Sequence, residues 1–148
     1  MQALGGAKNH AVVLPDADVD QAVDALMGAA YGSAGERCMA VSVAVAVGEK
    51  TGDIVVEKLT QRIRKLKVAP GTDPKAEMGP LVTKEHFARV AGDVETGVQE
   101  GAKLAADGRG IAVPRGGQGV FVRVCPFDRV PPEMPLSRAR PFRPELPA

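Results

Sequence analysis

Residues 19–47, VDQAVDALMGAAYGSAGERCMAVSVAVAV, contain a helix pattern, a glycine-containing loop and a strand pattern in that order. The helix pattern follows Asp18, which forms a weak capping box with Gln21 three residues later. One apolar stripe repeats at helical spacing: Val19, Ala22, Val23, Leu26, Met27 and Ala30. The strand pattern, residues 41–47, is apolar on both faces apart from Ser42, so we expect it to be covered on both sides. A helix leading into a buried strand indicates an α/β layer.

The flanking segments continue this alternation. Upstream, a short apolar run is closed by Pro15, as expected of a buried strand. Downstream, one helix pattern ends before Pro70 and Gly71, and Thr83 can cap another. The remaining predicted elements are strands at residues 11–14, 104–106 and 119–124, and a helix at residues 53–67. The sequence therefore predicts an α/β fold in which strands and helices alternate.

The end of the chain has a different composition. Most of its twelve prolines lie here, at Pro126, Pro131, Pro132, Pro135, Pro141, Pro144 and Pro147. They alternate with Arg138, Arg140 and Arg143. Proline lacks the backbone donor and the φ freedom that helices and central strands need. We therefore divide the chain into a folded part, residues 1–125, and a disordered Pro/Arg-rich tail, residues 126–148.

Composition narrows the classes of function. With 19 basic and 18 acidic residues, the net charge of +1 gives no footprint for nucleic acid or an anionic membrane. No stretch is long and apolar enough to span a bilayer. The two cysteines, Cys38 and Cys125, have no paired spacing, so neither a disulfide framework nor a zinc site is indicated. These features favour small-molecule chemistry in a reducing compartment, with the cytoplasm as the expected location.

Three side chains are candidates for catalysis from residue type alone. Cys38 follows a glycine-bounded loop and stands beside Arg37, a cation that favours a thiolate. A lone cysteine, however, is more often a small buried hydrophobe than a nucleophile. His86 falls on the predicted third helix between charged neighbours, where a solvated surface position is expected, and no carboxylate is placed to orient His10. The residues alone leave both interpretations of Cys38 open.

Three blocks of the chain resemble consecutive blocks of methylmalonate-semialdehyde dehydrogenases, which are members of the aldehyde dehydrogenase superfamily. They are LGGAKNH at residues 4–10, GAAYGSAGERCMA at residues 28–40 and EMGPLVT at residues 77–83. The middle block is the most specific, and the resemblance extends over most of the chain. It implies that the chain is a fragment of the aldehyde dehydrogenase catalytic domain.

The resemblance also implies a mechanism. Cys38 matches the family nucleophile, which attacks an aldehyde, passes hydride to NAD and keeps the acyl group as a thioester. The Cys38 backbone N–H matches one donor of the oxyanion hole, whose other donor is an asparagine outside this chain. Leu4 and Phe142 match positions at the cofactor site. The full-length family forms homo-oligomers, and neither a metal nor nucleic acid nor a membrane is implied.

One departure from the wider superfamily indicates the acyl acceptor. Hydrolytic members place a water-activating glutamate directly before the Leu-Gly-Gly motif, where this chain has Ala3. This departure matches the methylmalonate-semialdehyde type, in which the thiol of CoA releases the acyl group. The substrates of that type are methylmalonate and malonate semialdehyde, which give propionyl-CoA and acetyl-CoA with loss of CO₂ in valine and thymine breakdown.

Other departures count against activity in this chain alone. Family members are far longer, and their N-terminal part binds NAD and the substrate carboxylate. The family glutamate that holds the nicotinamide ribose corresponds to Arg140, and guanidinium cannot accept hydrogen bonds from hydroxyls. We therefore expect the isolated chain to be inactive. Two alternatives are a non-catalytic remnant that packs against other chains, and a hydrolytic aldehyde dehydrogenase, which Ala3 disfavours.

Overall fold

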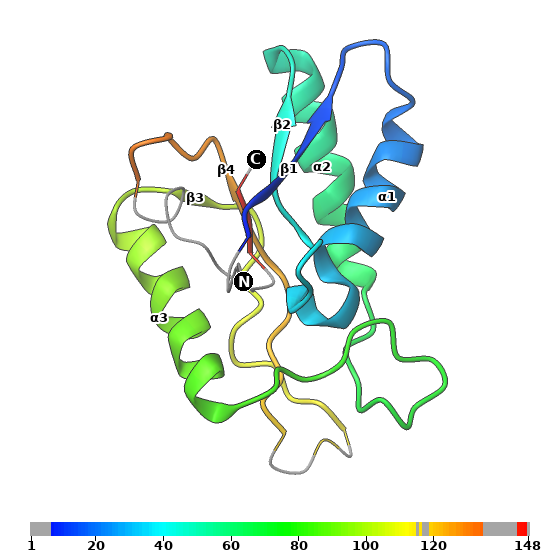
Figure 1. Ribbon diagram of the computed structural model, residues 1–148, viewed down its shortest axis with the longest axis vertical. Coiled ribbons are helices and arrows are strands. Elements are labelled where there is room, and N and C mark those ends of the chain that lie inside the picture. The colour runs from blue at the N-terminus through cyan, green and yellow to red at the C-terminus, as the bar shows by residue number, and fades with distance from the viewer. Residues whose placement is uncertain (1–6, 115, 117–118, 135–144, 148) are drawn as a thin grey trace, which may run out of the picture.

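The computed structural model describes residues 7–114, 116, 119–134 and 145–147 of the 148-residue chain. Its first part is a βαβ unit: strand β1 (Asn9–Val13) runs parallel to β2 (Val41–Ala46), and helix α1 (Val19–Tyr31) connects them. Helix α2 (Glu49–Lys65) follows β2 and packs beside α1 on the same side of this two-stranded sheet (Figure 1). The predicted α/β order is confirmed in this part of the chain.

Helix α1 has the boundaries that the sequence predicts. The Asp18 carboxylate accepts hydrogen bonds from the backbone N–H groups of Asp20 and Gln21, so it caps two donors that the first turn leaves without partners. Apolar side chains of α1 and α2 face each other and form the core of this half: Val23, Leu26, Val55, Leu59 and Ile63. The contact between these two helices positions the loop that follows α1.

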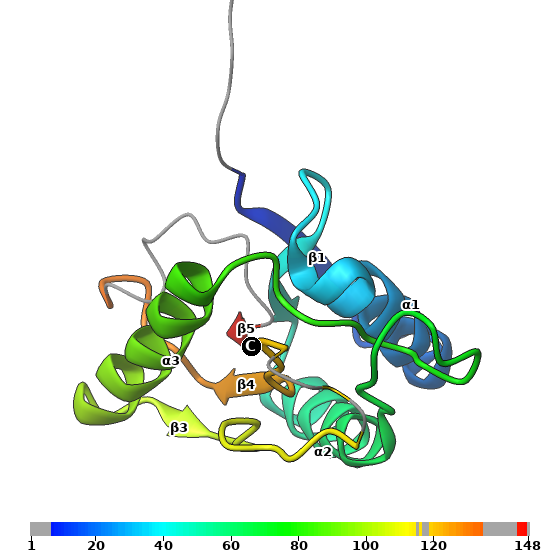
Figure 2. The ribbon, with the colours of Figure 1, turned by 90° about the horizontal axis from the view of Figure 1, so that it is seen from below.

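The second part contains helix α3 (Lys84–Gln99) and a three-stranded sheet in the order β3 (Lys103–Leu104), β4 (Cys125–Asp128), β5 (Glu145–Pro147). Strand β4 pairs antiparallel with β3 and parallel with β5. Thr83 caps α3 as predicted, because its hydroxyl accepts from the His86 N–H. Figure 2 shows β4 and β5 between α3 on one side and α1 on the other.

Two predictions about the end of the chain are corrected. Residues 119–124 do not form a strand, although Phe121, Val122 and Val124 are buried, so their apolar pattern reflects burial without a ladder. The strand is β4, which crosses the predicted boundary at residue 125, and the Pro126 carbonyl accepts from the Ala105 N–H. Predicted disorder is therefore wrong for residues 126–128. Residues 135–144 and 148 lie outside the described part.

The predicted burial of the first sheet is also corrected. Ser42 and Ala44 of β2 are buried against the helices, but Val45 is 40% exposed and Val12 of β1 is 62% exposed. Cover on both faces is therefore incomplete in this chain: α1, α2 and β5 contact β2, but Val45 and Val12 stay exposed. Helix α2 begins at Glu49, earlier than predicted, after Gly48 with φ +89°, a conformation that favours glycine. No helix among the described residues has the length and apolarity to cross a membrane.

Candidate active site

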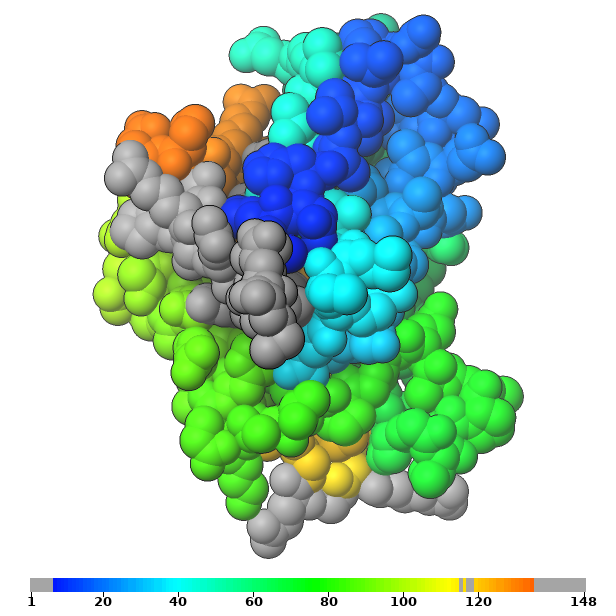
Figure 3. All heavy atoms as spheres, viewed as in Figure 1, coloured from blue at the N-terminus to red at the C-terminus, as the bar shows by residue number. Residues whose placement is uncertain are grey.

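Cys38 lies exposed in a turn between the short 3-10 helix η1 (Gly32–Gly35) and strand β2. Ser33, Ala34 and Gly35 all have positive φ, at 52°, 54° and 74°, so the backbone leaves α1 through a strained left-handed segment. The Ala40 N–H then donates to the Arg37 carbonyl at 3.1 Å and closes the turn. Figure 3 shows this segment at the surface, beside β1. An exposed thiol in a defined turn is what an attacking nucleophile requires.

Arg37 connects the turn to the end of helix α1. Its Nη2 donates to the Gly28 carbonyl at 2.7 Å and to the Ala29 carbonyl at 3.2 Å. A guanidinium at this position also complements the negative end of the helix dipole. A Cβ on Gly32 would lie 2.7 Å from Nη2, so a larger residue at this position would displace the guanidinium. The sequence assigned Arg37 an effect on the thiolate, but its guanidinium is bonded to α1.

Glu36 connects the same loop to the beginning of helix α3. Its Oε1 lies 3.3 Å from His86 Nε2 and accepts from the Val82 N–H at 3.4 Å. The side chains of Glu36 and His86 are only 14% and 19% exposed. The predicted solvated position of His86 is therefore wrong. Its partner lies fifty residues away in the sequence, and helical periodicity gives no signal for such a pair.

Asn9 holds the turn from strand β1. Its Nδ2 donates to the Cys38 carbonyl at 3.0 Å and to the Ala40 carbonyl at 2.9 Å. Asn9 belongs to the block LGGAKNH at residues 4–10, but the sequence predicts no role for it. Its neighbour His10, considered as a base, is exposed, and its Nδ1 lies 2.9 Å from the Lys8 carbonyl oxygen. The structure thus brings Asn9, and not His10, to the turn that carries Cys38.

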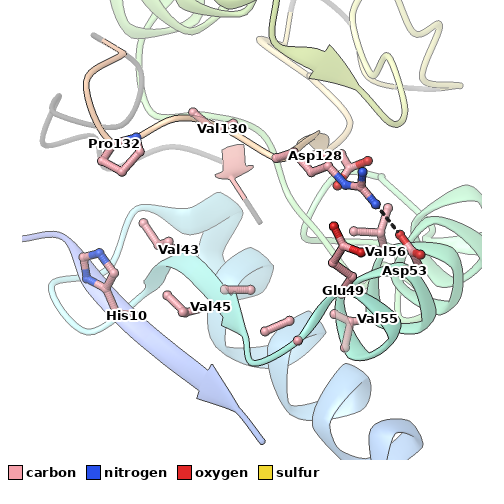
Figure 4. A pocket seen from close by; sticks show the side chains of 15 residues that line it. His10, Val43, Val45, Glu49, Asp53, Val55, Val56, Asp128, Val130 and Pro132 are labelled. Atoms are coloured by element: carbon pink, nitrogen blue, oxygen red, sulfur yellow. Dashed lines mark hydrogen bonds and ion pairs between the residues drawn. The ribbon is translucent and has the colours of Figure 1, made fainter. Parts of the chain in front are cut away.

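A cavity of about 670 Å³ lies on the bare side of β2, between Val43 and Val45 on one wall and Val130 and Pro132 on the other (Figure 4). Cys38 does not line it. Among the described residues that line it, the Asp53 carboxylate is bonded to Arg129 and the Asp128 carboxylate to Lys103, each at 2.8 Å. Two of its carboxylates therefore already have cationic partners.

The other predicted site residues are not placed by the structure. Leu4 and Phe142, predicted at the cofactor site, lie outside the described residues, as do Ala3 and Arg140. Among the residues that the structure describes, no group of three or more His, Cys, Asp or Glu side chains is arranged to hold a metal ion. The described site therefore consists of Cys38 and the three side chains that hold its loop, Asn9, Glu36 and Arg37.

Comparison with known proteins shows which family the chain resembles. The model of the aldehyde dehydrogenase family matches residues 1–147. A malonate-semialdehyde dehydrogenase of Pseudomonas aeruginosa is 53% identical over 99% of this chain, which spans 29% of that protein. The crystal structure of a methylmalonate-semialdehyde dehydrogenase from Oceanimonas doudoroffii matches with a TM-score of 0.93 and 51% identity. The match covers 97% of this chain and 30% of that protein.

A more distant structure shows the same fold with a cofactor. Betaine aldehyde dehydrogenase from Staphylococcus aureus, solved in complex with NAD⁺, has a TM-score of 0.90 and 28% identity. The match covers 97% of this chain and 28% of that protein. The chain thus spans less than a third of the length of the relatives it matches.

Proposed function

Because the chain belongs to the aldehyde dehydrogenase family, we propose that it carries the nucleophile for the NAD-dependent, CoA-acylating oxidation of malonate or methylmalonate semialdehyde. The observation that carries the proposal is the exposed Cys38 in a turn held from three sides. Since the chain spans 29% of its relative, the complete activity belongs to a longer protein or an assembly. The catalytic role of Cys38 and the cofactor contacts of Leu4 and Phe142 remain predictions.

The chemistry at Cys38 proceeds in two stages. The thiolate adds to the aldehyde carbon, forming a C–S bond, and the carbonyl oxygen becomes an oxyanion that the Cys38 N–H stabilises. NAD, held by the rest of the longer protein, would supply the hydride acceptor. Collapse of the oxyanion to a carbonyl would then leave the acyl group as a thioester on the Cys38 sulfur. The CoA thiol then attacks the thioester carbonyl, and the Cys38 thiolate leaves as acyl-CoA forms. Loss of the substrate carboxylate as CO₂ gives acetyl-CoA or propionyl-CoA.

The position of Glu36, the carboxylate nearest in sequence to Cys38, favours a thiol over water as the acceptor of the acyl group. Glu36 is two residues before Cys38, but its carboxylate is largely buried and accepts from Val82 N–H beside His86. A carboxylate held there is not directed at a water molecule approaching the thioester. Together with Ala3 at the position of the water-activating glutamate, this arrangement supports CoA over hydrolysis. Unlike water, CoA brings a nucleophilic thiol that needs no such base.

A chimeric enzyme tests the proposal. The matching segment of the Pseudomonas aeruginosa relative is replaced with this chain, and NADH formation from malonate semialdehyde is measured with and without CoA. We expect NADH to form only when CoA is present. Cys38→Ala should abolish this activity, and Cys125→Ser should retain it. The variant Arg140→Glu restores an acceptor for the ribose hydroxyls, so we expect it to lower KM for NAD.

Different results would support the alternatives. NADH formation that proceeds equally without CoA would show a hydrolytic enzyme. A folded chimera that stays inactive even with Arg140→Glu would show that the chain is a non-catalytic remnant. Equal activity in the Cys38→Ala variant would remove the nucleophile from the proposal.

A further inference from the structure

The peptide bond between Arg37 and Cys38 has a fixed orientation within the turn that carries Cys38. The Arg37 carbonyl accepts from the Ala40 N–H at 3.1 Å, and the chain has no cis peptide bonds in its described part. In a trans peptide the C=O and the following N–H point in opposite directions. Because this carbonyl points toward Ala40, the Cys38 N–H is directed away from the interior of the turn. This is the N–H that the proposed function assigns to the oxyanion.

Asn9 fixes the other carbonyls of the same turn. Its amide nitrogen donates to both the Cys38 and the Ala40 carbonyls, at 3.0 and 2.9 Å, which uses both of its N–H donors. The parallel register between β1 and β2 shifts between Asn9 and His10, where Asn9 pairs with Val41 and His10 with Val43. Such irregularities redirect a side chain at the end of a ladder. Here the shift lies at Asn9 itself.

We propose that Asn9 is a positioning residue that keeps the Cys38 N–H directed at the oxygen of the carbonyl under attack. The inference rests on the proposed role of Cys38 as nucleophile. Asn9 does not contact the reacting atoms. It acts through its hydrogen bonds to the Cys38 and Ala40 carbonyls of the turn. Neither aspartate, which has no donor when ionised, nor alanine, which lacks the amide, reproduces both bonds. Its loss lets the turn rotate while the thiol stays exposed.

Two reagents separate positioning of the N–H from exposure of the thiol. Iodoacetamide alkylates the thiolate by displacing iodide, and no oxyanion forms. p-Nitrophenyl acetate is attacked at its ester carbonyl, forms an oxyanion, and then loses p-nitrophenolate as the C–O bond breaks and the acetyl group stays on Sγ. Peptide mapping of the whole chain by mass spectrometry gives both rates at Cys38, separately from Cys125. The ratio of acylation to alkylation therefore reports the oxyanion donor.

We expect Asn9→Ala and Asn9→Asp to lower the acylation rate of Cys38 by about tenfold, a fraction of the loss of a complete oxyanion donor. Alkylation should change by less than about twofold, because exposure is retained. Val12→Ala is the matched control: Val12 is on the same strand, is 62% exposed, and should change neither rate. Circular dichroism identifies variants that fail to fold.

The possible failures are distinguishable. Equal loss of both reactions in a folded Asn9 variant, an unchanged ratio, or unfolding of both variants would overturn the positioning role and leave Cys38 as a nucleophile. A ratio in the parent chain no higher than that of a small free thiol would overturn it as well. If instead Cys38 of the parent chain alkylates no faster than Cys125, the proposed function itself fails.

Discussion

The two cysteines of the chain occupy opposite kinds of structure. Cys38 is exposed in a turn that three side chains hold through hydrogen bonds to backbone groups, and one of them, Glu36, also lies 3.3 Å from His86 Nε2. Cys125 is 1% exposed at the start of β4, and its Sγ accepts from the Gly108 N–H at 3.3 Å. The region of Cys38 is therefore held by polar contacts from distant segments, whereas the region of Cys125 is held by apolar packing.

The difference shows how the chain separates stability from reactivity. Phe121, Val124 and Phe127 surround the second region and are at most 9% exposed, so they contribute to the core. Met39, next to Cys38, is 73% exposed and contributes little to the core. A turn held by polar contacts can present a thiol and a backbone N–H to substrate without removing apolar side chains from the core. Substitutions in the two regions should therefore have different consequences.

The largest expected difference is in stability. Phe127→Ala removes a side chain that is 1% exposed in β4 and should lower the free energy of unfolding by about 3–5 kcal/mol. Met39→Ala, its counterpart beside Cys38, should change it by less than about 0.5 kcal/mol. Urea unfolding followed by circular dichroism measures both. Similar values for the two variants would show that the two regions are not separated in this way.

Thiol chemistry gives the next contrast. Iodoacetamide at neutral pH should label Cys38 about 100-fold faster than Cys125, because Cys125 reacts only after local opening. At about 1.36 kcal/mol per factor of ten, this ratio corresponds to about 2.7 kcal/mol of opening free energy. In urea above the unfolding midpoint the two rates should become similar, which is the internal control. A ratio near one in the folded chain would contradict the assignment of Cys38 as the accessible thiol.

The sequence predicts the two regions unequally for physical reasons. Helix α1 is recovered from local signals, the Asp18 cap and the apolar stripe, because both act within a few residues. The contacts of the Cys38 turn are not recovered, because Asn9 and His86 reach it from β1 and α3 across long sequence separations. The strand predicted at residues 119–124 lies instead at residues 125–128. The reason is that the buried apolar residues before Cys125 do not pair with another strand. The assignment of Cys38 as the nucleophile comes from the resemblance, not from residue type, and stays a prediction.

A smaller effect is expected at the glycine under Arg37. Gly32→Ala places a Cβ 2.7 Å from the guanidinium, so Arg37 must move and weaken its bonds to Gly28 and Ala29. We expect a loss of about 1–2 kcal/mol, since these partly exposed charged hydrogen bonds are stronger than neutral ones. Gly28→Ala is the matched control, because no heavy atom outside its chain neighbours and the backbone of its own helix lies within 4 Å of the added Cβ, and alanine favours helix. It should be neutral or stabilising, and a loss equal to that of Gly32→Ala would contradict the role of Arg37.

The smallest effect is expected at Tyr31, where the two regions meet. Tyr31 ends α1 before the Cys38 loop, is 1% exposed, and its hydroxyl has no hydrogen-bond partner among the described residues. Burial first, and the nearby Cys125 second, raise the pKa of Tyr31 above its ordinary value. Removing an unsatisfied buried hydroxyl relieves its desolvation cost, so Tyr31→Phe should stabilise the chain by about 1 kcal/mol at neutral pH.

The pH dependence of this gain tests its cause. Because the pKa of Tyr31 is higher in the folded chain than in the unfolded chain, its contribution to stability is complete below the unfolded value of about 10 and is lost as pH rises above it. The parent chain therefore loses stability above about pH 10 through ionisation of Tyr31 in the unfolded state, a loss that phenylalanine cannot have. Urea midpoints of both chains, measured from neutral to alkaline pH, should diverge in favour of Tyr31→Phe. A constant difference across that range would mean that Tyr31 ionises as readily in the folded chain as in the unfolded chain, so that its hydroxyl is not buried where the two regions meet.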